Sequence, residues 1–291
     1  MGYGQHQSFY LRDRWLNKAI KHLNEDSRFF YDNEAFEKIG LGKNMVQSLR
    51  FWTVATKVVD EDFNQERKKI HHTTEFGKIL YQYDRYIQFN DSASIIHYHL
   101  SKEKEPSTVW YWFFNILNET IITKEELLEQ FIIWVRANEV KSVSEKSLKR
   151  DVDCLIKLYT AGQSTDDPEE VIQSPINKVK LLNEKKGNVY KLSGDIESIG
   201  TIALMYVLLD YKSTEEVDTI SVEEISYKAG LWGKIFNMNR TNTINALNLL
   251  TKHPKFPITF SRTNNLDTIK LPNVTAYDYL KYELNKKVEK L

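Results

Sequence analysis

The chain has 291 residues, of which 41% are hydrophobic and 12% are aromatic. This composition excludes a disordered protein and supplies enough apolar side chains for two or three small domains or for one large one. Forty basic residues balance forty acidic ones, so any affinity for nucleic acid must come from local patches and not from a net positive charge.

The single cysteine, Cys154, excludes an internal disulfide and a cysteine-based zinc site. The N-terminus lacks the apolar run of a signal peptide, and the densest apolar run, at 109–117, is too short to cross a membrane. We therefore expect a cytoplasmic protein, and the sequence predicts no cofactor.

The first third of the chain predicts a helix, a glycine turn and a second helix. NEAFEKI precedes the turn at 40–44, and MVQSLRFWTVA follows it. The turn is too short for a Walker phosphate loop and continues with Asn44 where Ser or Thr would bind magnesium. It also lacks the third glycine of a dinucleotide-binding turn. VVDEDFNQERKKIHHTT then predicts a charged hairpin, and TTEFGKILYQY a closing helix.

The helix after this turn has two different faces. Met45, Leu49 and Trp52 share the apolar face, and the polar face presents the candidate DNA-contacting residues Lys43, Asn44, Gln47 and Arg50. Basic side chains can contact phosphate or guanine, a glutamine can pair with adenine, and a helix N-terminus attracts phosphate. The alternatives are a solvated face or a protein-docking surface.

Two later segments share a second pattern. ITKEEL at 122–127 and ISVEEI at 220–225 both have the S/T-x-x-E spacing of a capping box. After each come a second helix and a predicted hairpin, at 178–193 and at 257–272. A helix-turn-helix followed by a hairpin is the winged-helix arrangement. We therefore predict a mainly α protein with small β-hairpins (α+β), built from tandem winged-helix units over 1–105, 106–195 and 196–291. The polar run at 162–170 is predicted to be a surface loop.

The later units supply further candidate DNA contacts. In the second unit, Lys146, Lys149 and Arg150 are predicted to face outward, with Asp151 and Asp153 diluting their charge. The remaining candidates lie in the hairpin turn and at the start of the third unit's second helix: Lys185, Lys186, Arg240 and Asn242. If the units are equivalent, the early helix positions Met45, Leu148 and Ile244 should all face inward.

The histidines raise the question of a metal site. On a strand, His97 and His99, which flank Tyr98, would share one face. His71 and His72 are adjacent and would lie on alternate faces. No carboxylate or cysteine lies near them at ligand spacing, so we predict no metal site. Cys154 is predicted to be a buried, inert thiol. Because no catalytic motif is present, we expect a protein without enzymatic activity.

The N-terminal segment HQSFYLRDRWLNKAI, at 6–20, carries a specific resemblance. It resembles the opening motif of a prokaryotic family known as domain of unknown function 4007, and the resemblance continues through GLGKNMVQSLRFW, TVWYWFFN and SLKRDVDC. The motif residues are His6, Phe9, Arg12, Trp15 and Lys18, to which the family assigns no role. Many members have Glu at the position of Gln7, which argues against an essential acid there.

The resemblance implies a genomic context. Such proteins are encoded beside a PAPS-reductase-like sulfurtransferase and a cysteine desulfurase, in DNA phosphorothioation and phage-defence clusters. We therefore expect a non-catalytic adaptor subunit that binds double-stranded DNA and has these two enzymes as partners. The alternatives are a transcriptional regulator of the cluster and an enzyme of the pathway. Two interpretations of the motif remain open. Its basic residues Arg12, Arg14 and Lys18 could contact phosphates. Alternatively, Arg12 and Trp15 fix the N-terminal segment onto the first domain.

Overall fold

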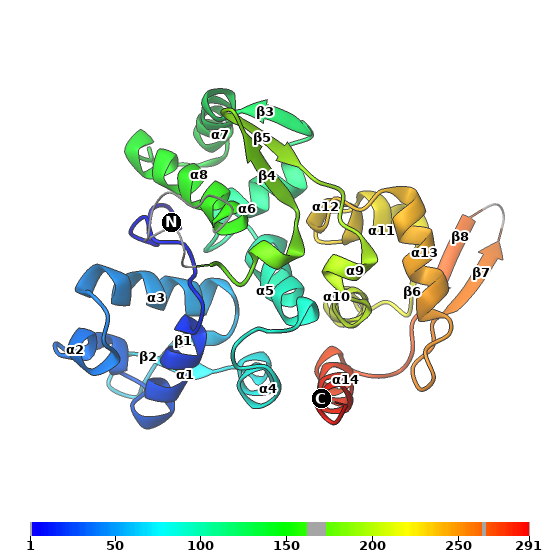
Figure 1. Cartoon of the computed structure of the whole chain (residues 1–291), viewed down its shortest axis with the longest axis horizontal. Coiled ribbons are helices and arrows are strands. Elements are labelled where there is room, and N and C mark those ends of the chain that lie inside the picture. Colours follow the sequence, from blue (N-terminus) through cyan, green and yellow to red (C-terminus); the bar gives the residue numbers. More distant parts are fainter. Residues whose placement is uncertain (1, 162–172, 264–265, 291) are drawn as a thin grey trace.

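The computed structural model describes residues 2–161, 173–263 and 266–290 (Figure 1). The predicted loop at 162–170 lies outside these residues. Within them the chain is mixed α/β, with many helices and three small antiparallel sheets. The expectation of a mainly helical chain with small hairpins is thereby confirmed. No helix in this part of the chain is long and apolar enough to span a membrane.

The first third is a group of helices followed by a two-stranded hairpin. Its elements are α1 (Trp15–Glu25), η1 (Phe29–Tyr31), α2 (Ala35–Ile39), α3 (Lys43–Ala55), β1 (Val59–Phe63), β2 (Lys69–Thr73) and α4 (Glu75–Tyr83). Gly40 ends α2 with a left-handed φ of 67°, a conformation that glycine adopts without steric cost. The predicted hairpin pairs Val59 with Thr73 and Phe63 with Lys69, and the predicted closing helix is α4.

The middle third adds a strand before its helix pair. Its elements are α6 (Thr108–Tyr111), the π-helix η2 (Trp112–Ile116), β3 (Ile121–Thr123), α7 (Lys124–Asn138), α8 (Glu145–Thr160), η3 (Asn177–Val179), β4 (Leu182–Lys185) and β5 (Asn188–Lys191). The predicted capping box is present, because Thr123 Oγ1 accepts from the Glu126 amide while the glutamate side chain bonds back to Thr123. The sheet order is β3-β5-β4.

The last third repeats this order with one more short helix before its second main helix and a further helix after the hairpin. Its elements are α9 (Ile196–Ile199), α10 (Thr201–Glu215), β6 (Thr219–Ser221), α11 (Val222–Tyr227), α12 (Trp232–Ile235), α13 (Arg240–Leu250), β7 (Thr259–Thr263), β8 (Leu266–Lys270) and α14 (Ala276–Val288). The second capping box is also present, between Ser221 and Glu224. The sheet order β6-β8-β7 matches that of the middle third.

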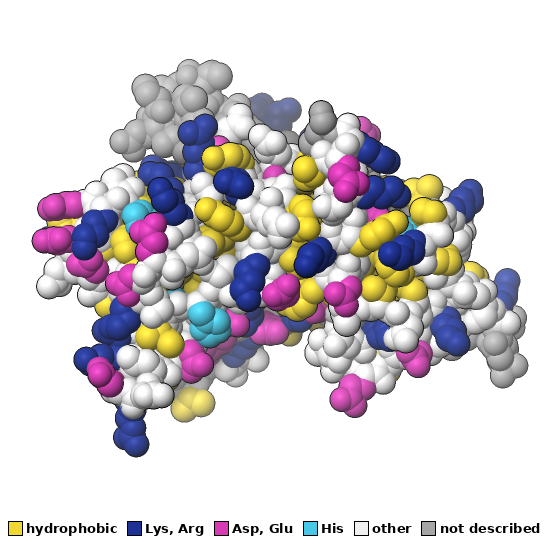
Figure 2. Space-filling model, turned by 90° about the horizontal axis from the view of Figure 1, so that it is seen from below, with side chains coloured by type: hydrophobic (Ala, Val, Ile, Leu, Met, Phe, Trp, Pro, Cys, Tyr) yellow, Lys and Arg dark blue, Asp and Glu magenta, His cyan; other side chains and the backbone are white. Residues whose placement is uncertain are grey.

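The C-terminal helix α14 returns to the start of the molecule, where it packs against both α4 and α10 (Figure 1). Lys287 on α14 donates to Asp91 at a distance of 2.7 Å. Figure 2 views the molecule from the side on which α14 and α4 lie. Basic and acidic side chains are interspersed over this face, which agrees with the balanced charge of the chain.

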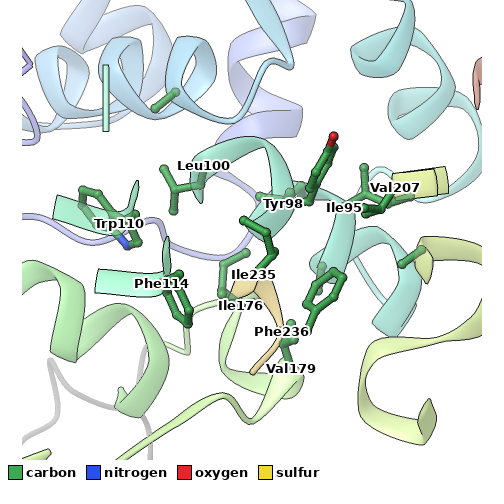
Figure 3. Packing of buried hydrophobic residues seen from close by; sticks show 14 of the residues in the cluster. Ile95, Tyr98, Leu100, Trp110, Phe114, Ile176, Val179, Val207, Ile235 and Phe236 are labelled. Atoms are coloured by element: carbon green, nitrogen blue, oxygen red, sulfur yellow. The ribbon is translucent and has the colours of Figure 1, made fainter. Parts of the chain in front are cut away.

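The core is centred on the helix α5 (Asn90–Lys102), in which every residue from Asp91 to Ser101 is buried. This helix contacts α6, α9, α10, α12 and η3. In Figure 3, Leu100 lies toward Trp110 at one end, and Ile95 lies toward Val207 at the other. One buried hydrophobic cluster therefore runs through all three groups of elements.

Candidate nucleic-acid interface

The start of α3 presents the residues predicted to contact DNA. Lys43, Asn44 and Gln47 are exposed, no side chain caps the helix at Gly42, and no acidic residue lies in its first turn. The first amides and the helix dipole therefore face solvent with a lysine beside them, which suits an anion. Arg50 is half-buried, with its Cζ atom 5.5 Å from the centre of the Tyr31 ring.

The polar face of α8 differs from the prediction. Lys146 and Lys149 are exposed, as expected, but Arg150 is half-buried and donates to Ser147 Oγ at 3.3 Å. Asp151 is only 2% exposed, so the prediction that it faces outward was wrong. Burial raises the pKa of its carboxyl group, against the opposing effect of a hydrogen bond from His6. Asp153 remains exposed.

The other candidate residues are spread more widely. Lys185 and Lys186 are exposed where β4 turns into β5. Arg240 is exposed at the start of α13, but the Asn242 side chain donates to the Gly194 carbonyl at 2.9 Å. In Figure 1, α13 lies at the opposite end of the long axis from α3. The structure thus brings α3 and α8 together and leaves α13 apart.

The three helix positions expected to be equivalent are not equally buried. Leu148 is 1% exposed, whereas Met45 and Ile244 are half-buried. Met45 and Ile244 still pack against the core, but the buried positions in the first half of α3 include Val46 and Leu49.

The N-terminal segment lies between α3 and α8. The carbonyl oxygen of Phe9 accepts from Trp52 Nε1 at 2.9 Å and from Ser48 Oγ at 3.3 Å, both on α3. The same oxygen lies 3.7 Å from the Cys154 thiol on α8. Cys154 is buried, and its burial raises the pKa of the thiol well above the ordinary value, in keeping with the predicted inert role.

His6 and Asp151 form the centre of this junction. His6 Nε2 lies 2.8 Å from Asp151 Oδ1, and the Gly4 amide donates to the same oxygen at 2.8 Å. His6 Nδ1 accepts from the Ser8 amide at 3.2 Å. Nε2 therefore carries the proton that is shared with Asp151. The contact between Asp151 and His6 was not predicted, although SLKRDVDC and the N-terminal motif both belong to the family resemblance.

The remaining motif residues pack within the fold. The Arg12 guanidinium carbon lies 5.5–5.8 Å from the ring centres of Phe9, Tyr10 and Trp15. Trp15 is 4% exposed. Lys18 donates to the Ile39 carbonyl at the end of α2, at 3.2 Å, where a lysine stabilises the helix terminus.

A polar cleft of about 410 Å³ opens beside this junction. The N-terminal segment contributes Gln5 and Gln7, α3 contributes Gln47 and Arg50, and the β1–β2 hairpin adds Glu61 and Lys69. Sequence analysis identified Gln47 and Arg50 here but missed the two N-terminal glutamines, because nothing in a local pattern shows that residues 5–7 reach α3.

A second cleft of about 490 Å³ is lined by the β1–β2 hairpin, α4, α5, α10 and α14. Lys102 Nζ and the Tyr98 hydroxyl each donate to Asp210 Oδ2 at 2.6 Å. Burial opposes ionisation of Asp210, but Lys102, His99 and the Tyr98 hydroxyl together hold the pKa of this carboxyl below its ordinary value. Tyr277 lines the same cleft, and burial raises the pKa of its hydroxyl.

His71 and His72 lie on the predicted hairpin strand β2, whereas the second pair of histidines does not lie on a strand. His97 and His99 lie on the buried helix α5 and not on a strand. His97 contacts the Tyr159 hydroxyl at 2.7 Å and the Ile235 carbonyl at 2.8 Å. Burial lowers the pKa of His97 to about 4 and that of His99 to about 3. His71 is also buried, with a pKa lowered to about 4, whereas His72 is exposed.

Across the described part of the chain, no three His, Cys, Asp or Glu side chains converge as a metal-binding group. The fold and its surfaces define a mainly helical protein with small antiparallel sheets, whose N-terminal segment joins two helices with polar outer faces. The chain belongs to the family described as "Protein of unknown function (DUF4007)", whose profile matches residues 3–284.

Two solved structures share the fold. A magnesium ion-bound SspB crystal structure has a TM-score of 0.86 at 21% identity, and an SspB crystal structure has a TM-score of 0.85 at 20% identity. Each similarity covers 99% of this chain and 88% of the other. At this identity the likeness concerns the fold alone. No curated protein sequence matches the chain.

Proposed function

We propose that this protein is a DNA-binding subunit of a prokaryotic DNA sulfur-modification or phage-defence system, built from three winged-helix units. The order helix, strand, capped helix, helix and hairpin in the middle and last thirds supports this reading, as does the shared strand order of their sheets. The first third has the same order without the first strand and without the side-chain cap on its helix α2. Membership of the family supports the biological context.

The observation that carries the DNA-binding proposal is the exposed, uncapped start of α3. Lys43, Asn44 and Gln47 lie there with no acidic side chain in the first turn. Phosphate binds favourably at such a helix end, and side chains on the first turns can reach base edges. The exposed Lys146 and Lys149 on the neighbouring α8 extend the surface.

The adaptor part of the proposal rests on charge. The chain has no net positive charge, and acidic side chains accompany the basic ones on the face shown in Figure 2. We expect the isolated protein to bind duplex DNA weakly, with a Kd of about 10⁻⁶ M or higher at physiological salt. A partner then supplies further contacts, and we propose that this partner is the PAPS-reductase-like sulfurtransferase, which the cysteine desulfurase supplies with sulfur.

Fluorescence anisotropy with a labelled duplex tests the DNA-binding proposal. The double variant Lys43→Ala/Gln47→Ala should weaken binding about tenfold, since it removes one phosphate contact and one base contact. The matched control is Lys78→Ala/Gln82→Ala, which has the same i, i+4 spacing on the exposed face of α4. If both variants bind the duplex with the same affinity as the wild type, the polar face of α3 does not contact DNA and is instead solvated or a protein-docking surface.

A second candidate function is an enzyme of the same pathway, which the cleft around Asp210 favours. Titratable groups with shifted pKa values often gather at catalytic sites. Here His99 and Asp210 share a cleft with Lys102 and Tyr277.

Incubation of supercoiled plasmid with the protein and magnesium tests the enzyme candidate. The adaptor proposal predicts intact plasmid. Cleavage that the Asp210→Asn variant abolishes, with its fold retained by circular dichroism, would assign the protein as an enzyme instead.

A further inference from the structure

The cleft between the N-terminal segment and α3 has one wall, the N-terminal segment, that the DNA-binding proposal does not use. Three carboxamide side chains line it, from Gln5, Gln7 and Gln47. A carboxamide has both donors and an acceptor, so it can pair with the mixed donors and acceptors on the edge of a nucleobase.

The backbone that carries two of these glutamines is held in an uncommon conformation. Gly4, Gln7 and Ser8 all have positive φ values, of 65°, 51° and 70°. Non-glycine residues in this region cost free energy, and they persist where the surrounding structure fixes them. The buried Asp151 does so here, because it binds both the Gly4 amide and the His6 ring from behind. Since His6 points into the core, Gln5 and Gln7 on either side of it line the cleft.

The cleft also holds an uncompensated positive charge. Lys69 and Glu61 form an ion pair with each other. Arg50 forms no ion pair in the described part of the chain, and its guanidinium lies over the Tyr31 ring. A guanidinium that stacks on a ring in this way retains donors for a phosphate oxygen.

We propose that this cleft binds a single nucleotide, with Arg50 taking the phosphate and the glutamine carboxamides taking the base. The volume of about 410 Å³ falls in the range of small-molecule sites, and Phe51 and Val54 supply apolar wall for the sugar and the base. The inference rests on the proposed DNA-binding function when the nucleotide is part of a strand. A base in a stacked duplex cannot enter such a cleft, so the nucleotide must be unstacked or free.

The test uses the full-length Gln5→Ala/Gln7→Ala variant, because neither residue lies on α3. Its control is Gln65→Ala/Gln82→Ala, which changes two exposed glutamines outside the cleft. The first measurement is the fluorescence of a duplex that contains 2-aminopurine, which brightens when the base leaves the stack. We expect brightening with the wild type and the control but not with the variant, while all three bind the duplex equally.

The second measurement is calorimetric titration with each of the four deoxynucleoside 5′-monophosphates and with the deoxynucleosides. Saturable binding of a monophosphate, weakened about tenfold in the glutamine variant, would identify a free nucleotide as the ligand. The Arg50→Lys variant should then lose much of the preference for the monophosphate over the nucleoside, because lysine lacks the planar fork of arginine.

These experiments distinguish failure of the nucleotide-site proposal from failure of the DNA-binding proposal. Duplex binding with no brightening and no nucleotide binding would overturn the nucleotide site and leave the DNA-binding proposal standing. Nucleotide binding without duplex binding would overturn the DNA-binding proposal and support the site for free nucleotides. A glutamine variant that matches the control in both measurements would overturn the role given to Gln5 and Gln7.

Discussion

The Nε2 atom of His6 lies 2.8 Å from Oδ1 of Asp151, and both side chains are almost completely shielded from solvent. This contact joins the N-terminal segment to α8, while Phe9 joins the same segment to α3. The segment is therefore a structural link between two helices with polar outer faces, and its loss should disturb both.

The first prediction concerns this link. Asp151→Ala leaves the buried His6 Nε2–H and the Gly4 amide without an acceptor, so it should lower the free energy of unfolding by about 2–4 kcal/mol. Asp153→Ala removes an exposed carboxylate from the same helix and should change it by less than about 0.5 kcal/mol. Urea unfolding measures both, and equal effects of the two substitutions would contradict the role given to Asp151.

The second prediction concerns pH. Burial lowers the pKa of His71, His97 and His99 below the ordinary value, so these rings are neutral in the folded protein at pH 7. Their unfolded forms bind protons below about pH 6.5, and stability should therefore be lost as the pH falls from about 6.5 to 4. His97 alone accounts for at most about 3 kcal/mol.

Urea unfolding between pH 7.5 and pH 4.5 checks this expectation. The contribution of His97 is the difference in pH dependence between the wild type and His97→Gln. A pH dependence that the substitution leaves unchanged would show that His97 does not titrate on unfolding in this range.

Local signals in the sequence predicted some elements well. The capping boxes at Thr123 and Ser221 are short-range patterns that specify a helix start, and the structure has both. Burial that depends on residues far apart in the sequence was predicted less well. The alternation of His97 and His99 was interpreted as a strand, but every residue from 91 to 101 is buried, so α5 shows no polar face by which its helical period could be recognised.

In the candidate site, too, features set by neighbouring residues were predicted and features set by distant residues were not. The exposed start of α3 follows from a turn and a helix that are adjacent in sequence. Asp151 was placed outward because it neighbours lysines on α8, and its true partner, His6, lies far away in the sequence. Only the tertiary fold brings Gln7 to the cleft beside Arg50.

The third prediction concerns the protein partner. Co-expression with the PAPS-reductase-like sulfurtransferase of the same gene cluster should yield a complex that survives size-exclusion chromatography. This complex should bind duplex DNA at least about tenfold more tightly than either protein alone, because contacts from two linked surfaces add. Tight, sequence-specific binding by the isolated chain, with no complex, would instead favour a transcriptional regulator.

The most direct test of the account is the salt dependence of duplex binding by a triple variant. Replacement of Lys43, Lys146 and Lys149 by alanine removes one exposed lysine from the start of α3 and two from the first half of α8. The slope of log K against log salt should become shallower by about three units relative to the wild type. A control in which Lys78, Lys281 and Lys290 are replaced loses the same charge from exposed positions on α4 and at the C-terminal end of the chain, and it should keep the wild-type slope. Equal slopes for the triple variant and the wild type would contradict DNA binding by α3 and α8.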